Sequence, residues 1–208
     1  MIAEVSVKEK VILFDGTTLD NFLEFYNDDL TFTGNRSRWE LKDGAMTVTT
    51  RHDASSEYEY GDAHVHVEFN LPYMPEKTGQ GRANSGLFIH GCYEIQILDS
   101  YGKETPGVDD CGALYGIAAP LVNACKAPGE WQSFDVFVRA ARLREDGSVE
   151  KHAVMTVFLN GQLIHNNLEV PRHCDCGCYD RIVERGPVFL QDHFCPVSFR
   201  NIWVQPLD

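Results

Sequence analysis

The feature that most limits the fold of this chain is a strict alternation of apolar and polar side chains. In residues 64–71 (HVHVEFNL) every second residue is apolar, and the residues between them are His64, His66, Glu68 and Asn70. Successive side chains of a β-strand point to opposite faces, so the pattern predicts a strand with one face in a core. Similar segments predict further strands at residues 133–140, 153–166, 187–193 and 197–207.

Short turn signals separate these segments. Asn160-Gly161 divides residues 153–166 into a hairpin, and Asp43-Gly44 and Asp146-Gly147 predict two more. No amphipathic helix pattern exceeds about two turns. The chain is therefore predicted to be all-β, a single domain over residues 1–208 with roughly a dozen short strands. We expect one sheet to pack its convex side on the core and to present imidazoles, carboxylates and carboxamides on its concave side.

The charge of the chain excludes some partners. It carries 31 acidic and 18 basic residues, a net charge of −13, which argues against nucleic acid or an anionic membrane surface. No run of about 18 apolar residues predicts a membrane span, and no signal-peptide pattern opens the sequence. The seven cysteines are an odd number, which argues against a complete disulfide framework. We expect a reducing, cytoplasmic location.

Six segments occur in an order typical of one known family. They are LFDGTTLDNF (13–22), NSGLFIHGCYEIQILDS (84–100), GALYGIAAP (112–120), GEWQSFDVFV (129–138), VFLNGQLIHN (157–166) and GPVFLQDHFCPVSFRNIWVQPL (186–207). Together, from residue 11 to residue 207, they resemble the 3-keto-disaccharide hydrolase domain family.

The resemblance implies a two-sheet antiparallel jelly roll of the concanavalin A-like lectin and glucanase type. It also implies an enzyme for glycosides whose sugar C3 has been oxidised to a ketone by a separate oxidoreductase. The Cys-rich stretch 172–184 and Cys92 depart from the family pattern.

The strand at residues 94–99 (EIQILD) limits the chemistry. A retaining glycosidase needs two carboxyl groups about 5–5.5 Å apart. Glu94 and Gln96 share one face of this strand, but Asp99 points to the other, so the second carboxylate is missing unless Glu68 or another strand supplies it. A 3-keto sugar removes this need, because its ketone acidifies the C2 proton. The site then needs one base, donors for the enolate oxygen and an acid for the leaving group.

These needs define the candidate residues. Glu94 or His193 is predicted to be the C2 base, and the other one, or His90, to act on the leaving group. The predicted substrate-binding residues are Asn84, His90, Gln96, Gln191, Tyr115 and Glu68. Asp99 and Asp192 are predicted to cap turns or to orient neighbouring residues.

Two other functions remain open from the sequence: a non-catalytic carbohydrate-binding module of the same fold, or an ordinary glucanase. In each case the partner is a carbohydrate. Exposed sheet edges would also allow a homodimer.

A second cluster consists of soft metal ligands in the loop 171–185. Its members are His173, Cys174, Cys176 and Cys178. This spacing allows three interpretations: a zinc site completed by His173 or Cys195, a disulfide, or free thiols. His64 and His66 alternate on one strand face and would hold a divalent metal only with a third ligand. The sequence predicts no other cofactor.

Overall fold

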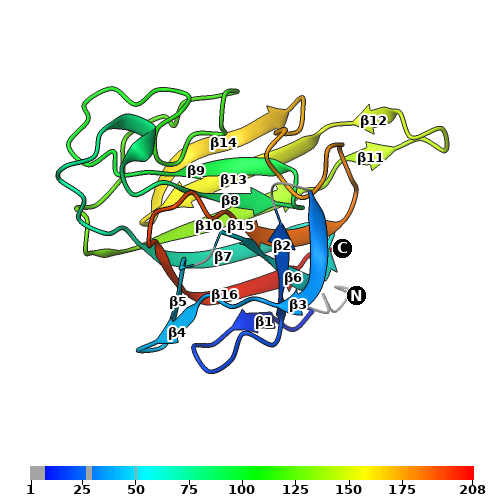
Figure 1. Ribbon diagram of the computed structural model, residues 1–208. Coiled ribbons are helices and arrows are strands. Elements are labelled where there is room, and N and C mark those ends of the chain that lie inside the picture. Colours follow the sequence, from blue (N-terminus) through cyan, green and yellow to red (C-terminus); the bar gives the residue numbers. More distant parts are fainter. Residues whose placement is uncertain (1–7, 27–29, 50) are drawn as a thin grey trace, which may run out of the picture.

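The computed structural model describes residues 8–26, 30–49 and 51–208, and these fold into a β-sandwich (Figure 1). The larger sheet has the strand order β14 (Gln162–Val170), β13 (Ala153–Leu159), β10 (Trp131–Arg139), β7 (Ala63–Asn70), β16 (Ser198–Pro206), β5 (Ala45–Thr47) and β4 (Glu40–Lys42), and β1 (Val11–Phe14) also pairs with β16. The smaller sheet has the order β3 (Thr31–Arg36), β2 (Phe22–Tyr26), β6 (Asp53–Tyr60), β15 (Gly186–Leu190), β8 (Ser85–Ile89) and β9 (Tyr93–Ile97).

The described strand pairs are antiparallel, which confirms the predicted two-sheet jelly roll. The only helix in the described part of the chain is the short 3-10 turn η1 (Gly79–Gly81), and no helix there could cross a membrane. A separate hairpin, β11 (Arg142–Leu143) and β12 (Val149–Lys151), extends from one end of the sandwich, opposite the long loops drawn in green (Figure 1).

The predicted alternation in β7 is confirmed, because its burial alternates residue by residue. Val65, Val67 and Phe69 are fully buried and pack in the same core cluster as Leu87 and Ile95 of the smaller sheet. Burial of these apolar surfaces away from water is the main favourable contribution to the free energy that holds the two sheets together.

The turn predictions are also confirmed. Asn160 and Gly161 connect β13 to β14 with φ of 54° and 77°, which is the left-handed backbone that a two-residue hairpin turn needs. Two strand ends are wrong. The strand expected to end at His193 ends at Leu190, so Gln191 and His193 lie in the connection that follows β15. The strand expected over residues 94–99 ends at Ile97, so Asp99 lies beyond β9.

The prediction that one sheet carries the polar side chains on a single concave face is wrong. The polar residues of β7, including His66 and Glu68, lie on the outer face of the larger sheet. Glu94 and Gln96 of β9 lie on the outer face of the smaller sheet, since Ile95 between them is in the core. The polar side chains of β7 and β9 thus lie on opposite outer faces of the sandwich.

The outer face of the smaller sheet is covered rather than open. Phe25, Phe88 and Phe189 form a second apolar cluster there, with Phe189 in edge contact with the other two rings at 5.4 and 5.2 Å. The connection between β14 and β15, residues 171–185, packs three half-buried cysteines, Cys174, Cys176 and Cys178, against this cluster. We call residues 171–185 the covering segment.

Candidate active site

Glu94 is the centre of the candidate site. Glu94 is the second residue of β9, and its side chain projects from the outer face of the smaller sheet and is 4% exposed. Burial raises the pKa of Glu94 to about 8, and no charged residue contributes to this change. The carboxyl is therefore mostly protonated at neutral pH.

A glycine determines where the carboxyl points. Gly86 and Phe88 on β8 pair with Gln96 and Glu94 on β9. A Cβ added at Gly86 would lie 2.8 Å from Glu94 Oε1 and 2.7 Å from the Phe88 ring. The Glu94 carboxyl therefore leans over Gly86, in the space that any larger residue would fill.

Two glutamines flank this glycine. Gln96 is its partner on β9, and the backbone N–H of Gln191 donates to the Gly86 carbonyl at 3.0 Å from the other side. Gln191 is half-buried, and the hydroxyl of Ser85 donates to its carbonyl at 2.7 Å. Oε1 of Glu94 thus lies in a row with two carboxamide residues.

Gln96 and Asn84 are held by a residue that the sequence did not single out, Gln80 of η1. The amides of Gln96 and Asn84 donate to Gln80 Oε1 at 3.0 and 2.9 Å. Asn84 Oδ1 is buried and accepts no hydrogen bond from any residue that the structure describes. Gln80 lies in the irregular stretch 73–83, whose sequence carries no pattern that identifies it.

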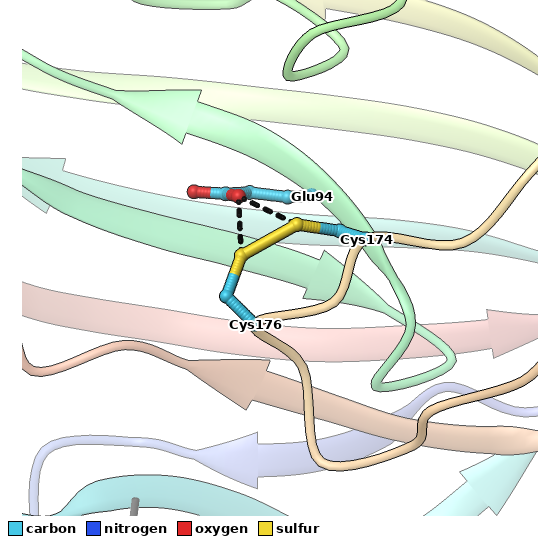
Figure 2. A group of neighbouring side chains, drawn as sticks. All are labelled: Glu94, Cys174 and Cys176. Carbon is cyan, nitrogen blue, oxygen red and sulfur yellow. Dashed lines mark hydrogen bonds between the residues drawn. A yellow bond between two sulfur atoms is a disulfide. The ribbon is translucent and has the colours of Figure 1, made fainter.

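The covering segment lies directly on Glu94. Figure 2 shows Cys174 and Cys176 joined by a disulfide, with both sulfurs 3.2 Å from Glu94 Oε2. The disulfide is one of the three interpretations that the sequence left open for this loop. The other five cysteines are free thiols.

Among the residues that the structure describes, the same three form the group that could hold a metal ion. The two sulfurs and a Glu94 carboxylate oxygen lie within 4.8 Å of one another. Metal ligation requires thiolates, so the trio offers a site for a thiophilic cation only when the disulfide is reduced. His173, paired with Asp175 at 3.2 Å, and Cys178, packed against Gly91, do not belong to this group.

Two further candidates are Tyr115 and His193. The backbone N–H of Tyr115 donates to the Glu94 carbonyl at 3.0 Å, and the Tyr115 side chain is half-buried. His193 follows Gln191 by two residues and is exposed. Asp192, between them, accepts a bond from the Phe194 N–H at 2.8 Å, and Asp99 accepts one from the Tyr101 N–H at 3.2 Å. Their predicted turn-capping role is confirmed.

His90 does not share the site. It is fully buried at the β8–β9 turn, its Nε2 bonds the Gly61 carbonyl at 3.0 Å, and its ring packs 4.8 Å from that of Tyr60. Burial lowers the pKa of His90 to about 4. The structure therefore contradicts its predicted role beside Glu94, because the side chain faces the core.

Glu68 is also separated from Glu94, because it lies on the opposite outer face of the sandwich. Its carboxylate accepts bonds from Arg200 at 2.6 Å and Asn201 at 2.8 Å. Glu68 can neither contact the same small ligand as Glu94 nor supply the second catalytic carboxylate that the sequence left open.

His64 and His66 share one acceptor on that same outer face. Nε2 of His64 and Nδ1 of His66 each lie 2.8 Å from Asp135 Oδ1. Burial raises the pKa of Asp135, but the bonds to the two histidines outweigh it and hold the pKa well below its usual value. No group of three metal ligands among the described residues includes either histidine.

Comparisons with known proteins assign the family. The model of the 3-keto-alpha-glucoside-1,2-lyase-like domain matches residues 9–205. The chain belongs to this family. A structure of a candidate glycosyl hydrolase from Parabacteroides distasonis ATCC 8503 is 32% identical, with a TM-score of 0.84 over 96% of this chain and 84% of that one.

More distant structures support the fold alone. A second candidate glycosyl hydrolase from the same organism is 20% identical, with a TM-score of 0.67 over 96% of this chain and 94% of that one. A third is also 20% identical, with a TM-score of 0.63 over 96% of this chain and all of the other. No curated protein sequence matches the chain. Membership of the 3-keto-alpha-glucoside-1,2-lyase-like family makes the chain a member of a carbohydrate-active, hydrolase- or lyase-like group.

Proposed function

We propose that this protein cleaves the glycosidic bond of 3-keto-glycosides by β-elimination followed by addition of water. The observation that carries the proposal is the Glu94 carboxyl: buried, surrounded by uncharged groups, and leaning over Gly86 between two glutamines. A carboxyl whose pKa is near the working pH can both accept and return a proton.

The proposed steps follow from that position. Glu94 Oε1 takes the C2 proton of a 3-keto sugar bound over Gly86, and the resulting enolate expels the C1 substituent. The amide groups of Gln96 and Gln191 donate to the enolate oxygen and to sugar hydroxyls. His193, exposed beyond Gln191, delivers a proton to the leaving oxygen. Water then adds to C1 of the enone, and Glu94 returns the proton to C2.

The covering segment bears on this proposal, because Glu94 is almost closed to solvent. Binding of a sugar over Gly86 requires residues 171–185 to move away from the Phe25, Phe88 and Phe189 cluster. Segments that close over a site in this way exclude water and complete the reacting geometry.

An ordinary retaining glucanase is less well supported. Its second carboxylate would stand about 5–5.5 Å from Glu94 and would raise the pKa of Glu94 electrostatically. Burial is the only cause of the raised pKa, so no described carboxylate acts on Glu94. The proposal also implies a partner oxidoreductase that makes the 3-keto sugar.

One assay separates the three functions. The purified protein is incubated with a 4-nitrophenyl 3-keto-glucoside and with the unoxidised parent glucoside. Release of nitrophenol from the keto substrate alone supports the proposal, and release from the parent supports a glucanase. Binding without release from either supports a carbohydrate-binding module.

The variant that tests the proposed base is Glu94→Gln, and its matched control is Glu40→Gln. Gln matches the shape of the acid but cannot take a proton, so a loss of at least about 100-fold in kcat is expected. Glu40 is exposed on β4 of the larger sheet, so Glu40→Gln should retain full turnover. Full turnover by Glu94→Gln would refute the assignment.

A further inference from the structure

The covering segment is anchored at one end of the candidate site, the turn between β8 and β9. The Cys174 N–H donates to the Cys92 carbonyl there at 2.7 Å. The Tyr179 N–H donates to the Gly91 carbonyl at 3.2 Å. A Cβ at Gly177 would collide with the same carbonyl, so glycine lets the segment lie against the turn. The leaving group of a bound glycoside therefore has to extend toward the other end of these strands.

The Glu94 carboxyl points toward that other end. Glu94 pairs with Phe88, yet its carboxyl leans over Gly86, which lies two residues farther from the turn. Beside Gly86, β15 pairs with β8 and continues into residues 191–197, which include Gln191 and His193. A 3-keto sugar over Gly86, with His193 at its leaving oxygen, would thus place its leaving group along this connection.

A cavity of about 290 Å³ lies along the connection. It forms where the chain between β15 and β16 meets the chain between β5 and β6, at one end of the sandwich (Figure 1). Both stretches contribute to its walls, which include Val48, Thr49, Arg51, Asp192, Phe194 and Cys195. The volume is at the small end for a ligand pocket and suits a group of about one ring.

The cavity is structurally continuous with the candidate site. Cys195 Sγ donates to the Gly81 carbonyl at 3.7 Å. Gly81 is the last residue of η1, the turn whose Gln80 accepts hydrogen bonds from Gln96 and Asn84. Residues 191–195 and η1 therefore position both the carboxamides around Glu94 and the wall of the cavity.

Phe194 presents an apolar ring at this cavity. Its side chain is 73% exposed, and its φ of 59° is a left-handed backbone that bulky residues rarely adopt. Asp192 Oδ1 accepts a hydrogen bond from the Phe194 N–H at 2.8 Å and holds this conformation. An exposed ring on an unfavourable backbone adds little to the core, so its placement favours contact with a ligand. Its flat face suits an aromatic ring.

Arg51 supplies a positive charge beside the ring. Its side chain is exposed, its guanidinium lies 5.8 Å from the centre of the Phe194 ring, and it forms no ion pair with any residue that the structure describes. In a chain with a net charge of −13, an unpaired cation attracts an anionic ligand to one place. Asp192 is the acidic residue of the wall, and burial raises its pKa, so it opposes an anion less than an exposed carboxylate would.

We propose that this cavity binds the leaving group and selects an aromatic one with an anionic substituent, the chemistry of a hydroxybenzoate. Phe194 stacks on the ring, and Arg51 pairs with the substituent. A second sugar is less well suited, because its hydroxyl groups would face Val48, Phe194 and Cys195 without hydrogen-bond partners. The effect on turnover rests on the proposed function, whereas binding of the free phenol does not.

The first test measures binding without turnover. 4-Hydroxybenzoate and its neutral match 4-hydroxybenzamide are titrated into ¹⁵N-labelled protein, and the amide shifts report the site and the Kd. The signals of residues 192–195 should move, and 4-hydroxybenzoate should bind more tightly than 4-hydroxybenzamide.

Two variants and a control separate the charge from the ring. Arg51→Met should weaken binding of 4-hydroxybenzoate about two- to fivefold and leave 4-hydroxybenzamide unchanged. Phe194→Ala should weaken both about two- to tenfold. Arg139→Met removes an exposed arginine from β10 of the larger sheet and should change neither. Arg51 and Phe194 are exposed, so both variants should fold, which circular dichroism checks.

The second test measures turnover of the 3-keto-glucosides of the same two phenols. The ratio of kcat/KM for the benzoate over the benzamide is taken within each protein, so a general loss of activity cancels. Arg51→Met should lower this ratio about two- to fivefold relative to the wild type, and Arg139→Met should retain it.

Several results would overturn the inference. One is that neither phenol moves the signals of residues 192–195, and another is an equal ratio in Arg51→Met and the wild type. A third is a 3-keto-disaccharide that is cleaved faster than both aryl substrates and loses this advantage in Phe194→Ala, because the cavity then serves a second sugar. Failure of the proposed function looks different: the phenols bind with the expected variant effects, but neither keto-glucoside is cleaved.

Discussion

The variant Glu94→Gln removes an ionisable group and should change how the free energy of unfolding depends on pH. The pKa of this carboxyl rises from an ordinary 4.5 to about 8 in the folded protein. Between these values the folded state keeps a proton that the unfolded state has released, so the stabilisation from Glu94 is complete below pH 4.5 and is lost as pH rises from there through 8. The stability that Glu94 contributes should fall by roughly 4 kcal/mol between pH 5 and pH 9.

The measurement is urea unfolding of oxidised protein at each pH from 5 to 9. Glu94→Gln cannot lose the proton, so its stability should lack this decline, and the two curves should converge or cross as pH rises. Glu40→Gln removes one exposed carboxylate and should follow the wild type. A difference between wild type and Glu94→Gln that stays constant within about 0.5 kcal/mol over the range would refute the reasoning, because Glu94 would then titrate alike in both states.

Two other changes test the surroundings of the site, and a third tests the outer face of the larger sheet. Gly86→Ala should lower kcat on the keto substrate about tenfold or more while the protein stays folded by circular dichroism, because the new Cβ takes the place of the Glu94 carboxyl. Phe189→Ala should cost about 3–5 kcal/mol in urea unfolding, since the buried ring packs on Phe25 and Phe88. Asp135 should stabilise the fold above pH 3.8 and lose this contribution as pH falls further. Asp135→Asn should therefore be less stable at pH 6 and depend less on pH in acid.

The strands could be predicted because their signals are local. β7 alternates because one face meets the core, and the Asn160-Gly161 turn follows from backbone conformations that favour these two residues. The end of β15 was misplaced by three residues, since the polar alternation of Gln191 and His193 continues past the last strand pairing. Periodicity reports which side chains alternate, not where hydrogen bonding between strands ends.

The assignment of strands to sheets could not be predicted in the same way. β7 and β9 both carry polar residues at every second position, yet they lie on opposite outer faces. Pairing of strands far apart in sequence decides this, and no residue within either strand encodes its partner. Glu94 and Gln96 were predictable as neighbours because they share one face of one strand, and Gln191 comes next to them because β15 pairs with β8. Glu68 and His90 were wrongly grouped with them because polarity alone does not reveal which way a face points.

The cover over Glu94 was the least predictable feature. All five residues of β9 are buried: Tyr93, Ile95 and Ile97 lie in the core, and residues 171–185 fold over Glu94 on the outer face. An irregular segment carries no period from which its packing could be inferred. Its cysteines suggested soft ligands, but the neighbour they contact is a carboxylate 80 positions earlier in the chain.

Burial of the Glu94 carboxyl without a cation lowers the stability of the fold at high pH, and this loss favours an enzyme over a sugar-binding module. A module needs hydrogen bonds to hydroxyl groups, and an exposed or ion-paired carboxylate supplies them without opposing folding above neutral pH. Glu94 instead is buried without a cation, and at high pH its ionisation works against the fold. Such a cost persists where a group must exchange a proton near neutral pH, as a catalytic base does. His66, Glu68 and Asp135 on the other outer face are all paired with polar neighbours, as structural residues are.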